Sequence, residues 1–164
     1  MEENSVSFDK RAFRQALGSF PTGVAVITTV ADAQPKGITV NSFTSVSLDP
    51  PMVLWCLDKK SDRYDTFIRS SCFTISVLGT AHEAVSSRLA RQGTHSLEGI
   101  DLIQTELGPP ALADALAFFE CSNEAVYEGG DHGILLGHVL RFAQREAGAP
   151  LVFFRGKYGA LADG

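Results

Sequence analysis

Small polar side chains crowd the stretch from Gly37 to Pro51, which opens on a glycine and closes on a Pro-Pro pair. Hydroxyls and an amide are interspersed there with apolar residues, as in a strand whose Thr and Ser side chains bond to a neighbouring strand. The same groups could instead hold a polar, planar ligand. The residues alone leave both interpretations open for this set: Thr39, Asn41, Ser42, Thr44, Ser45 and Ser47.

A second polar group, Lys59 to Ser61, precedes a short helix predicted from the spacing of Tyr64, Phe67 and Ile68. Ser61 is a candidate N-cap for that helix. Free backbone N–H groups at a helix N-terminus, together with a hydroxyl and two ammonium groups, would suit a phosphate or pyrophosphate. The alternative interpretation is an ordinary cap beside solvated lysines.

A third candidate lies in the glycine-rich turn from Gly130 to Gly133. Asp131 could fix the turn through the backbone, which would leave His132 exposed as a donor to a carbonyl or a negatively charged ligand. The alternative is a hairpin loop without a ligand.

Several familiar catalytic and binding motifs are absent from the sequence. It contains neither a Rossmann fingerprint nor a P-loop, and neither a nucleophile elbow nor a zinc-protease motif. Asp131-His132 with a serine is a poor hydrolytic group, because adjacent residues rarely orient each other as a triad does. His132 and His138 would share a strand face but have no third ligand, so we predict no metal site.

The elements that must position these residues are mostly strands. A helix over 8–20 has one apolar face, with Ser7 as candidate N-cap and Asp9 at its positive end. Thr80 and Glu83 form a capping-box pattern that opens a helix ending near Arg91. Polar connections are predicted at 31–36 and 128–133, and 93–108 has no regular pattern. The predicted strands are 24–30, 38–40, 52–57, 73–77, 116–127, 134–142 and 150–154.

Composition fits a single globular domain spanning 1–164. The formal net charge of −5 argues against a nucleic-acid surface, and no apolar run is long enough to cross a bilayer. The three cysteines lie in apolar segments and are expected to be buried and reduced, which favours the cytoplasm. Strands joined by short turns favour a mainly β, antiparallel barrel with a few flanking helices.

The ordered set of segments resembles the short-chain flavin reductase family, the reductase components of two-component flavin-dependent monooxygenases. The resemblance runs from about Phe13 to Leu161 and rests on four segments in this order: Phe20-Pro-Thr-Gly-Val-Ala-Val-Ile-Thr28, Gly37 to Pro51, Gly130-Asp-His132 with Leu136-Gly-His-Val139, and Phe154-Arg-Gly-Lys-Tyr158.

This resemblance implies a Greek-key-like split β-barrel of the FMN-binding type, a homodimer, and a site for FMN or FAD. It implies that Thr39, Asn41 and Ser42 bond the isoalloxazine edge and ribityl chain, and that His132 and Tyr158 lie where the nicotinamide stacks. Arg88 would reach the pyrophosphate or adenosine side. The ribityl phosphate would be held by Ser45, Ser47, Lys60 and Ser61, and the cofactor-binding set also includes Val40 and Val46.

The implied activity is hydride transfer from NADH or NADPH to FMN or FAD, with reduced flavin supplied to a partner monooxygenase. Such transfer is cofactor chemistry and needs neither a triad nor a metal, which agrees with the missing motifs. His132 is expected to position the nicotinamide rather than to act as an obligatory acid. Two alternatives are a non-catalytic flavin carrier or sensor and an oxidase of small amines. Relatives usually have Phe-Ala where this chain has Leu89-Ala90, which leaves the choice of flavin open.

Overall fold

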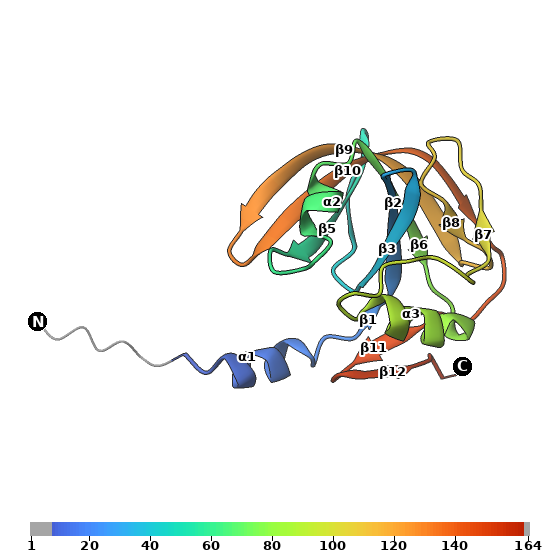
Figure 1. Ribbon diagram of the computed structural model, residues 1–164. Coiled ribbons are helices and arrows are strands. Elements are labelled where there is room, and N and C mark those ends of the chain that lie inside the picture. Colours follow the sequence, from blue (N-terminus) through green and yellow to red (C-terminus); the bar gives the residue numbers. More distant parts are fainter. Residues whose placement is uncertain (1–7, 163–164) are drawn as a thin grey trace, which may run out of the picture.

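The computed structural model describes residues 8–162, and its largest element is a seven-stranded sheet in which every pairing is antiparallel (Figure 1). The strands follow the spatial order β3-β2-β6-β9-β10-β5-β4. The predicted mainly β architecture is therefore confirmed. The strands are β2 (Ala25–Ala31), β3 (Gln34–Val40), β4 (Thr44–Leu48), β5 (Pro51–Asp58), β6 (Cys72–Val77), β9 (Ala117–Gly129) and β10 (His132–Gln144).

Two hairpins of this sheet turn over two residues, more tightly than the predicted six-residue connections. Asp32 and Ala33 join β2 to β3 with φ of 53° and 59°, the pair of positive values that a type I′ turn requires. Gly130 and Asp131 join β9 to β10, and Gly130 has φ of 72°. The residues that flank each two-residue turn belong to the strands, because their backbone groups pair across the hairpin, as Ala31 does with Gln34 and Gly129 with His132.

The sheet curls around a buried apolar cluster, yet its ends do not pair with each other within the described residues. Strand β3 at one end contacts β5, the strand next to the other end, without a hydrogen-bonded ladder. Trp55 is fully buried between Phe67 and Phe73, with edge-to-face ring centroids 5.3 and 5.7 Å apart. The edge of β3 and the end of β5 beyond its pairing with β4 therefore need partners other than a strand.

A second apolar cluster lies on the other face of β2 and includes a residue of α3 (Glu83–Leu89). Val26, Leu78 and Leu89 are fully buried in it, with Leu112 and Leu151 nearly so. Two small sheets cover this cluster, and the region predicted as irregular contributes one of their strands. Their strands are β1 (Thr22–Gly23), β7 (Leu102–Ile103), β8 (Ala111–Leu112), β11 (Val152–Phe154) and β12 (Lys157–Gly159).

The first helix, α1 (Lys10–Leu17), is shorter than predicted and contains no buried residue. Asp9 is its N-cap and accepts two backbone N–H bonds, while the predicted cap Ser7 lies outside the described residues. The helix projects from the body of the molecule in Figure 1. Its apolar face therefore does not serve the core of this chain.

The caps of the other two helices also differ from the prediction. Helix α2 (Tyr64–Ile68) has Arg63 as its N-cap residue, whereas Ser61 caps the preceding turn by accepting the Arg63 N–H. Before α3, a 3₁₀ turn occupies Thr80–His82, and the His82 Nδ1 accepts the Gly79 N–H. The histidine ring replaces the predicted capping box because the chain enters α3 through this tighter turn.

The three cysteines are free, and only Cys121 is fully buried. Burial raises the pKa of its thiol to about 12. Cys56 and Cys72 are half-buried, less than predicted. Within 8–162 no three His, Cys, Asp or Glu side chains gather as a metal site would need. No helix in that range is long and apolar enough to span a membrane.

Candidate active site

A cavity of about 350 Å³ opens where the sheet fails to close, between the ends of β3 and β5. Its volume lies within the range of small-ligand pockets, roughly 300–1,000 Å³. The walls come from the end of β3 and the bend after it, the end of β5, the turn before α2, the residues after α3 and the start of β10. The lining residues are Ile38, Thr39, Val40, Asn41, Ser42, Cys56, Leu57, Asp58, Ser61, Arg63, Ala90, Gln92 and His132.

Ser42 joins the two strand ends beside this cavity. Its hydroxyl accepts the Cys56 N–H at 2.9 Å and lies 3.1 Å from the Cys56 carbonyl oxygen, to which it donates. The side chain thus satisfies the N–H and C=O of Cys56, which lie beyond the part of β5 that pairs with β4. Ser42 lines the cavity and is also a structural link.

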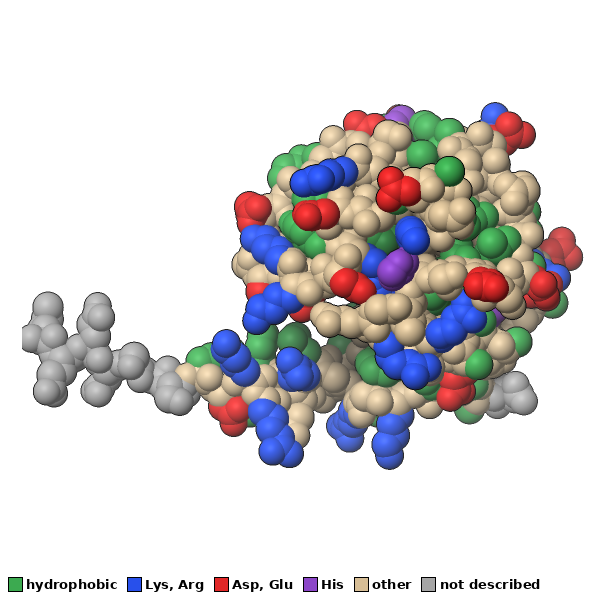
Figure 2. Space-filling model, viewed as in Figure 1, with side chains coloured by type: hydrophobic (Ala, Val, Ile, Leu, Met, Phe, Trp, Pro, Cys, Tyr) green, Lys and Arg blue, Asp and Glu red, His purple; other side chains and the backbone are tan. Residues whose placement is uncertain are grey.

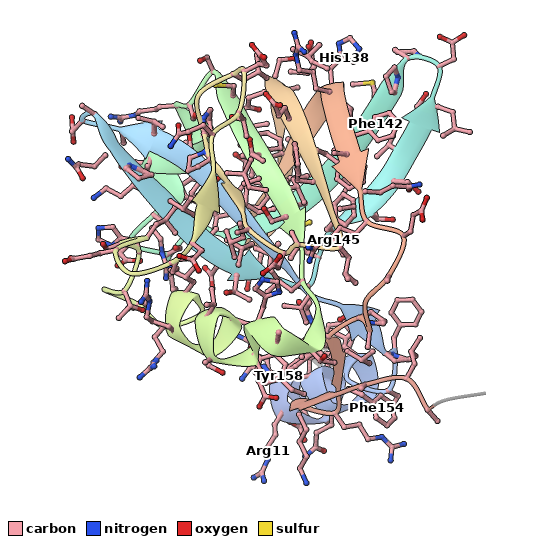
Figure 3. The ribbon with its side chains drawn as sticks, turned by 90° about the vertical axis from the view of Figure 1, so that its right-hand side faces the viewer. Arg11, His138, Phe142, Arg145, Phe154 and Tyr158 are labelled. Atoms are coloured by element: carbon pink, nitrogen blue, oxygen red, sulfur yellow. The ribbon has the colours of Figure 1, made fainter. Side chains whose placement is uncertain are left out.

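Thr39 takes part in a second structural contact. Its hydroxyl donates to the Ser86 carbonyl at 2.8 Å, and the Ser86 hydroxyl lies 2.6 Å from that of Tyr158. Figure 3 places Tyr158 between α3 and the C-terminal strands, and Tyr158 packs edge-to-face on Phe153. Tyr158, predicted beside the ring, therefore lies outside the cavity and supports α3, which braces β3.

Asn41 differs from its neighbours because its side chain is exposed. No hydrogen bond to its amide is found among the residues that the structure describes. The neighbouring Val40 packs its side chain into the core, so Val40 has only backbone groups to offer a polar partner. The bend therefore leaves one amide side chain exposed on the cavity wall.

His132 lies at the mouth of the cavity, at the start of β10. Its Nδ1 is 2.7 Å from the Asp131 carboxylate, so Nδ1 carries the proton and Nε2 stays available to a ligand. The hydrogen bond from His132 and the charge of its ring lower the pKa of Asp131. The Lys59 N–H donates to the Asp131 carbonyl and ties the turn to the end of β5.

The predicted phosphate group is only partly assembled. Ser61 lines the cavity, but Lys59 is paired with Glu128, and the exposed Lys60 is not part of the wall. The Lys60 N–H donates to the Asp58 carboxylate at 2.8 Å, which shapes the turn. The turn thus offers one side-chain hydroxyl, that of Ser61, at the wall.

Four other predicted residues do not line the cavity. Ser45, Val46 and Ser47 lie on β4, the strand at one end of the sheet, where a register shift falls between Ser45 and Ser47. Arg88 donates instead to the carbonyls of Ser96 and Glu98.

A second cavity, of about 460 Å³, lies on the other side of the polar bend. It shares Val40, Asn41 and Ser42 with the first cavity and adds the apolar side chains of Phe20 and Phe43. The sequence analysis used Phe20-Pro-Thr-Gly only as part of the resemblance. Asn41 is thus placed between a polar and a more apolar hollow.

Sequence reasoning also missed several wall residues, among which Arg63 is a charged side chain that is nevertheless buried. Nothing in the pattern around Arg63 distinguishes it from a solvated charge. The Leu89 side chain is fully buried in the second apolar cluster, while Ala90 lines the cavity. The Phe-to-Leu departure at that position therefore changes the core rather than the cavity wall.

We predict that Ser42→Ala lowers the free energy of unfolding by about 1–3 kcal/mol, because it leaves the Cys56 backbone groups without their partner. Urea denaturation measures this change. The matched control is Thr44→Ala, whose exposed hydroxyl makes a single long contact to the Ser45 carbonyl. It should change stability by no more than about 0.5 kcal/mol. Equal stability of the two variants would contradict the structural role of Ser42.

Known proteins of similar sequence and structure match nearly the whole chain. Residues 17–162 match the family model described as a flavin reductase like domain. The FMN reductase (NADH) SmoA of Agrobacterium fabrum is 44% identical over 94% of this chain and 87% of its own length. The flavin-dependent monooxygenase reductase subunit HsaB of Rhodococcus jostii is 38% identical over 94% of this chain and 80% of its own length.

The same relationship holds in three dimensions. The NADH:FAD oxidoreductase SgcE6 of Streptomyces globisporus, solved with NAD and FAD fragments, superimposes with a TM-score of 0.89 at 35% identity. The match covers 94% of this chain and 93% of that one. The chain therefore belongs to the flavin reductase-like family.

Proposed function

We propose that this protein is an NAD(P)H-dependent flavin reductase that transfers a hydride from NADH or NADPH to FMN or FAD. The observation that carries the proposal is the cavity beside the Ser42–Cys56 link, with the exposed Asn41 amide on its wall and His132 at its mouth. The relatives named above are reductases of FMN or FAD or reductase subunits. They give no support to a non-catalytic carrier or sensor.

The residues present fit a flavin. The isoalloxazine edge is a row of carbonyl and ring-nitrogen groups, and a bend with a free amide and backbone N–H groups offers complementary partners. The neighbouring apolar cavity, with Phe20 and Phe43, suits the dimethylbenzene end. Bound flavin supplies the acceptor for the hydride.

The chain's own groups would hold and polarise that flavin. Thr39, Val40, Asn41 and Ser42 present backbone groups to the ring edge, and preorganised donors there stabilise the negative charge that reduction creates. Ser61 would meet the ribityl phosphate, with Lys60 turning toward it from the same loop. His132 would orient the nicotinamide through Nε2.

The other predicted cofactor-binding residues do not line the cavity, so any role for them would be less direct. Ser45, Val46, Ser47 and Arg88 lie outside the cavity, so they would reach a ligand only where it extends beyond this wall. For Tyr158 we propose an indirect role, through Ser86 and Thr39.

An assay of two pyridine nucleotides against two flavins tests the function. Purified protein is mixed with NADH or NADPH and excess FMN or FAD, and nicotinamide absorbance is followed. We expect oxidation well above the rate without protein for at least one combination. Oxidation at the protein-free rate in all four combinations would favour the carrier, and product analysis would expose an amine oxidase.

We predict that His132→Ala raises the KM for NADH or NADPH by about tenfold and lowers kcat less, because the ring positions the nicotinamide without transferring a proton. Steady-state kinetics at saturating flavin measure both constants. The control is His138→Ala on the same strand: His138 lies in the middle of β10, far from Tyr158 in Figure 3, and does not line the cavity. A large fall in kcat at unchanged KM would contradict the positioning role.

We further propose that the curled sheet is the split β-barrel of the FMN-binding type, in a single domain spanning 1–164. Support comes from the approach of β3 to β5 and from the link that joins them at Ser42. The free cysteines favour a reducing compartment, and we propose the cytoplasm. We also propose that reduced flavin passes to a separate monooxygenase component, since relatives such as HsaB are reductase subunits.

We propose that the protein is a homodimer and that α1 lies in the interface. Phe13 and Leu17 share a face of α1 and are 50% and 58% exposed. A helix of eight residues is marginal without packing, so another chain is needed to cover this face. Basic side chains gather along α1 in Figure 2.

We predict that the Phe13→Glu, Leu17→Glu double variant is monomeric, because it places two charges in an apolar contact. Light scattering after size-exclusion chromatography measures the mass. The control, Gln15→Glu, adds a charge to the opposite face of the same helix and should leave a dimer. A monomeric wild-type protein, or a dimeric double variant, would refute this interface.

A further inference from the structure

Arg63 is a buried charge on the wall of the cavity, with only 3% of its surface exposed. Its Nη1 donates to the carbonyls of Gly37 at 3.1 Å and Leu89 at 2.7 Å, and its Nη2 donates to the carbonyl of Arg91 at 2.7 Å. Its Nε donates to the neighbouring Asp62 carboxylate at 3.1 Å. One guanidinium therefore joins β3 to the end of α3 and to the residues after it.

Asp62 extends this link to the same segment. Its second carboxylate oxygen accepts the Gly93 N–H at 2.7 Å. Burial alone would raise the pKa of Asp62, but this hydrogen bond and the charge of Arg63 outweigh it, so the pKa is lowered and the carboxylate stays ionised. The backbone from Leu89 to Gly93 is thus bound at three points by two adjacent side chains.

The geometry of these bonds is specific to arginine. The carbonyls of Leu89 and Arg91 lie at the C-terminal end of α3, where helix carbonyls lack intrahelical partners and carry partial negative charge. A planar guanidinium can meet three carbonyls in different directions, whereas an ammonium group is a compact point charge on a flexible stem. Lysine at this position would therefore keep the charge and lose the bridge.

The segment that Arg63 holds forms one wall of the cavity. Ala90 and Gln92 line the cavity on one side, and Thr39, Val40 and Asn41 line it on the other. Gly37, the β3 residue that accepts from Arg63, is tightly packed, since a Cβ there would lie 2.7 Å from Leu97 Cδ2. The spacing between the two walls is thus set at a rigid point of β3.

We propose that Arg63 is a positioning residue that holds the Ala90–Gln92 wall against the polar bend and thereby sets the affinity for flavin. This inference rests on the proposed function. If the wall were free to move, flavin binding would have to order it, and this ordering would reduce the affinity for flavin. Hydride transfer in the filled site depends instead on the flavin and the nicotinamide. The effect therefore falls on flavin binding more than on kcat.

The test compares Arg63→Lys and Arg63→Met with wild type in three measurements: the Kd for FMN and for FAD from flavin fluorescence, steady-state kinetics, and hydrogen exchange of the amides from Ala90 to Gly93. We expect the Kd for the preferred flavin to rise about tenfold in both variants, with kcat at saturating flavin changed less than about threefold. Exchange of the Gly93 amide should become faster, because its acceptor Asp62 loses the partner that orients it.

The control is Asn123→Ala, which removes side-chain bonds to the carbonyls of Phe67 and Ser70 outside the cavity. It should lower the melting temperature and leave the Kd for flavin unchanged. An unchanged Kd in Arg63→Lys, or an equal rise in Asn123→Ala, would overturn the proposal. If Arg63→Met does not fold, Arg63→Lys alone decides. Wild type that binds flavin without oxidising NADH or NADPH would refute the reductase function while leaving the Kd comparison valid, and wild type that binds neither flavin would refute both.

Discussion

The link between Ser42 and the backbone of Cys56 is the contact on which the site depends. The sheet curls until β3 approaches β5, but no ladder joins them among the described residues. A single hydroxyl, acting as donor and acceptor, replaces the strand pairing there. Closure by a side chain instead of a ladder leaves room beside the link, and that room is the cavity.

The polar stretch from Gly37 to Pro51 contains both side chains that bond within the protein and a side chain that is left exposed. The hydroxyls of Thr39 and Ser42 are used within the protein, on the carbonyl of Ser86 and the backbone of Cys56. The amide of Asn41 is exposed between two cavities and is free for a ligand. Structural hydroxyls therefore hold the bend in place, and the bend presents its amide and backbone groups outward.

The cavity walls come from segments far apart in the chain, and a few polar side chains hold them together. Arg63 fixes the end of α3 to β3, and Asp131 holds both the ring of His132 and, through its carbonyl, the end of β5. None of these groups forms a triad or a metal cluster. This suits a reaction in which the flavin and the nicotinamide carry the chemistry and the protein supplies geometry.

The sequence by itself determined most of the longer strands and the glycine turn, because period-two patterns and turn residues are local, and its ordered segments determined the family. It did not show β4 or most of the short strands of the two small sheets. It singled out Asn41 and His132, which line the same cavity. It could not find Arg63, whose partners are backbone carbonyls 26 and 28 residues away without a side-chain signature. It also grouped Ser45 and Ser47 with Ser42, although they lie beyond the bend on β4 and do not line the cavity. Only the curl of the sheet decided which polar residues face a ligand, since that depends on which strand ends meet in space.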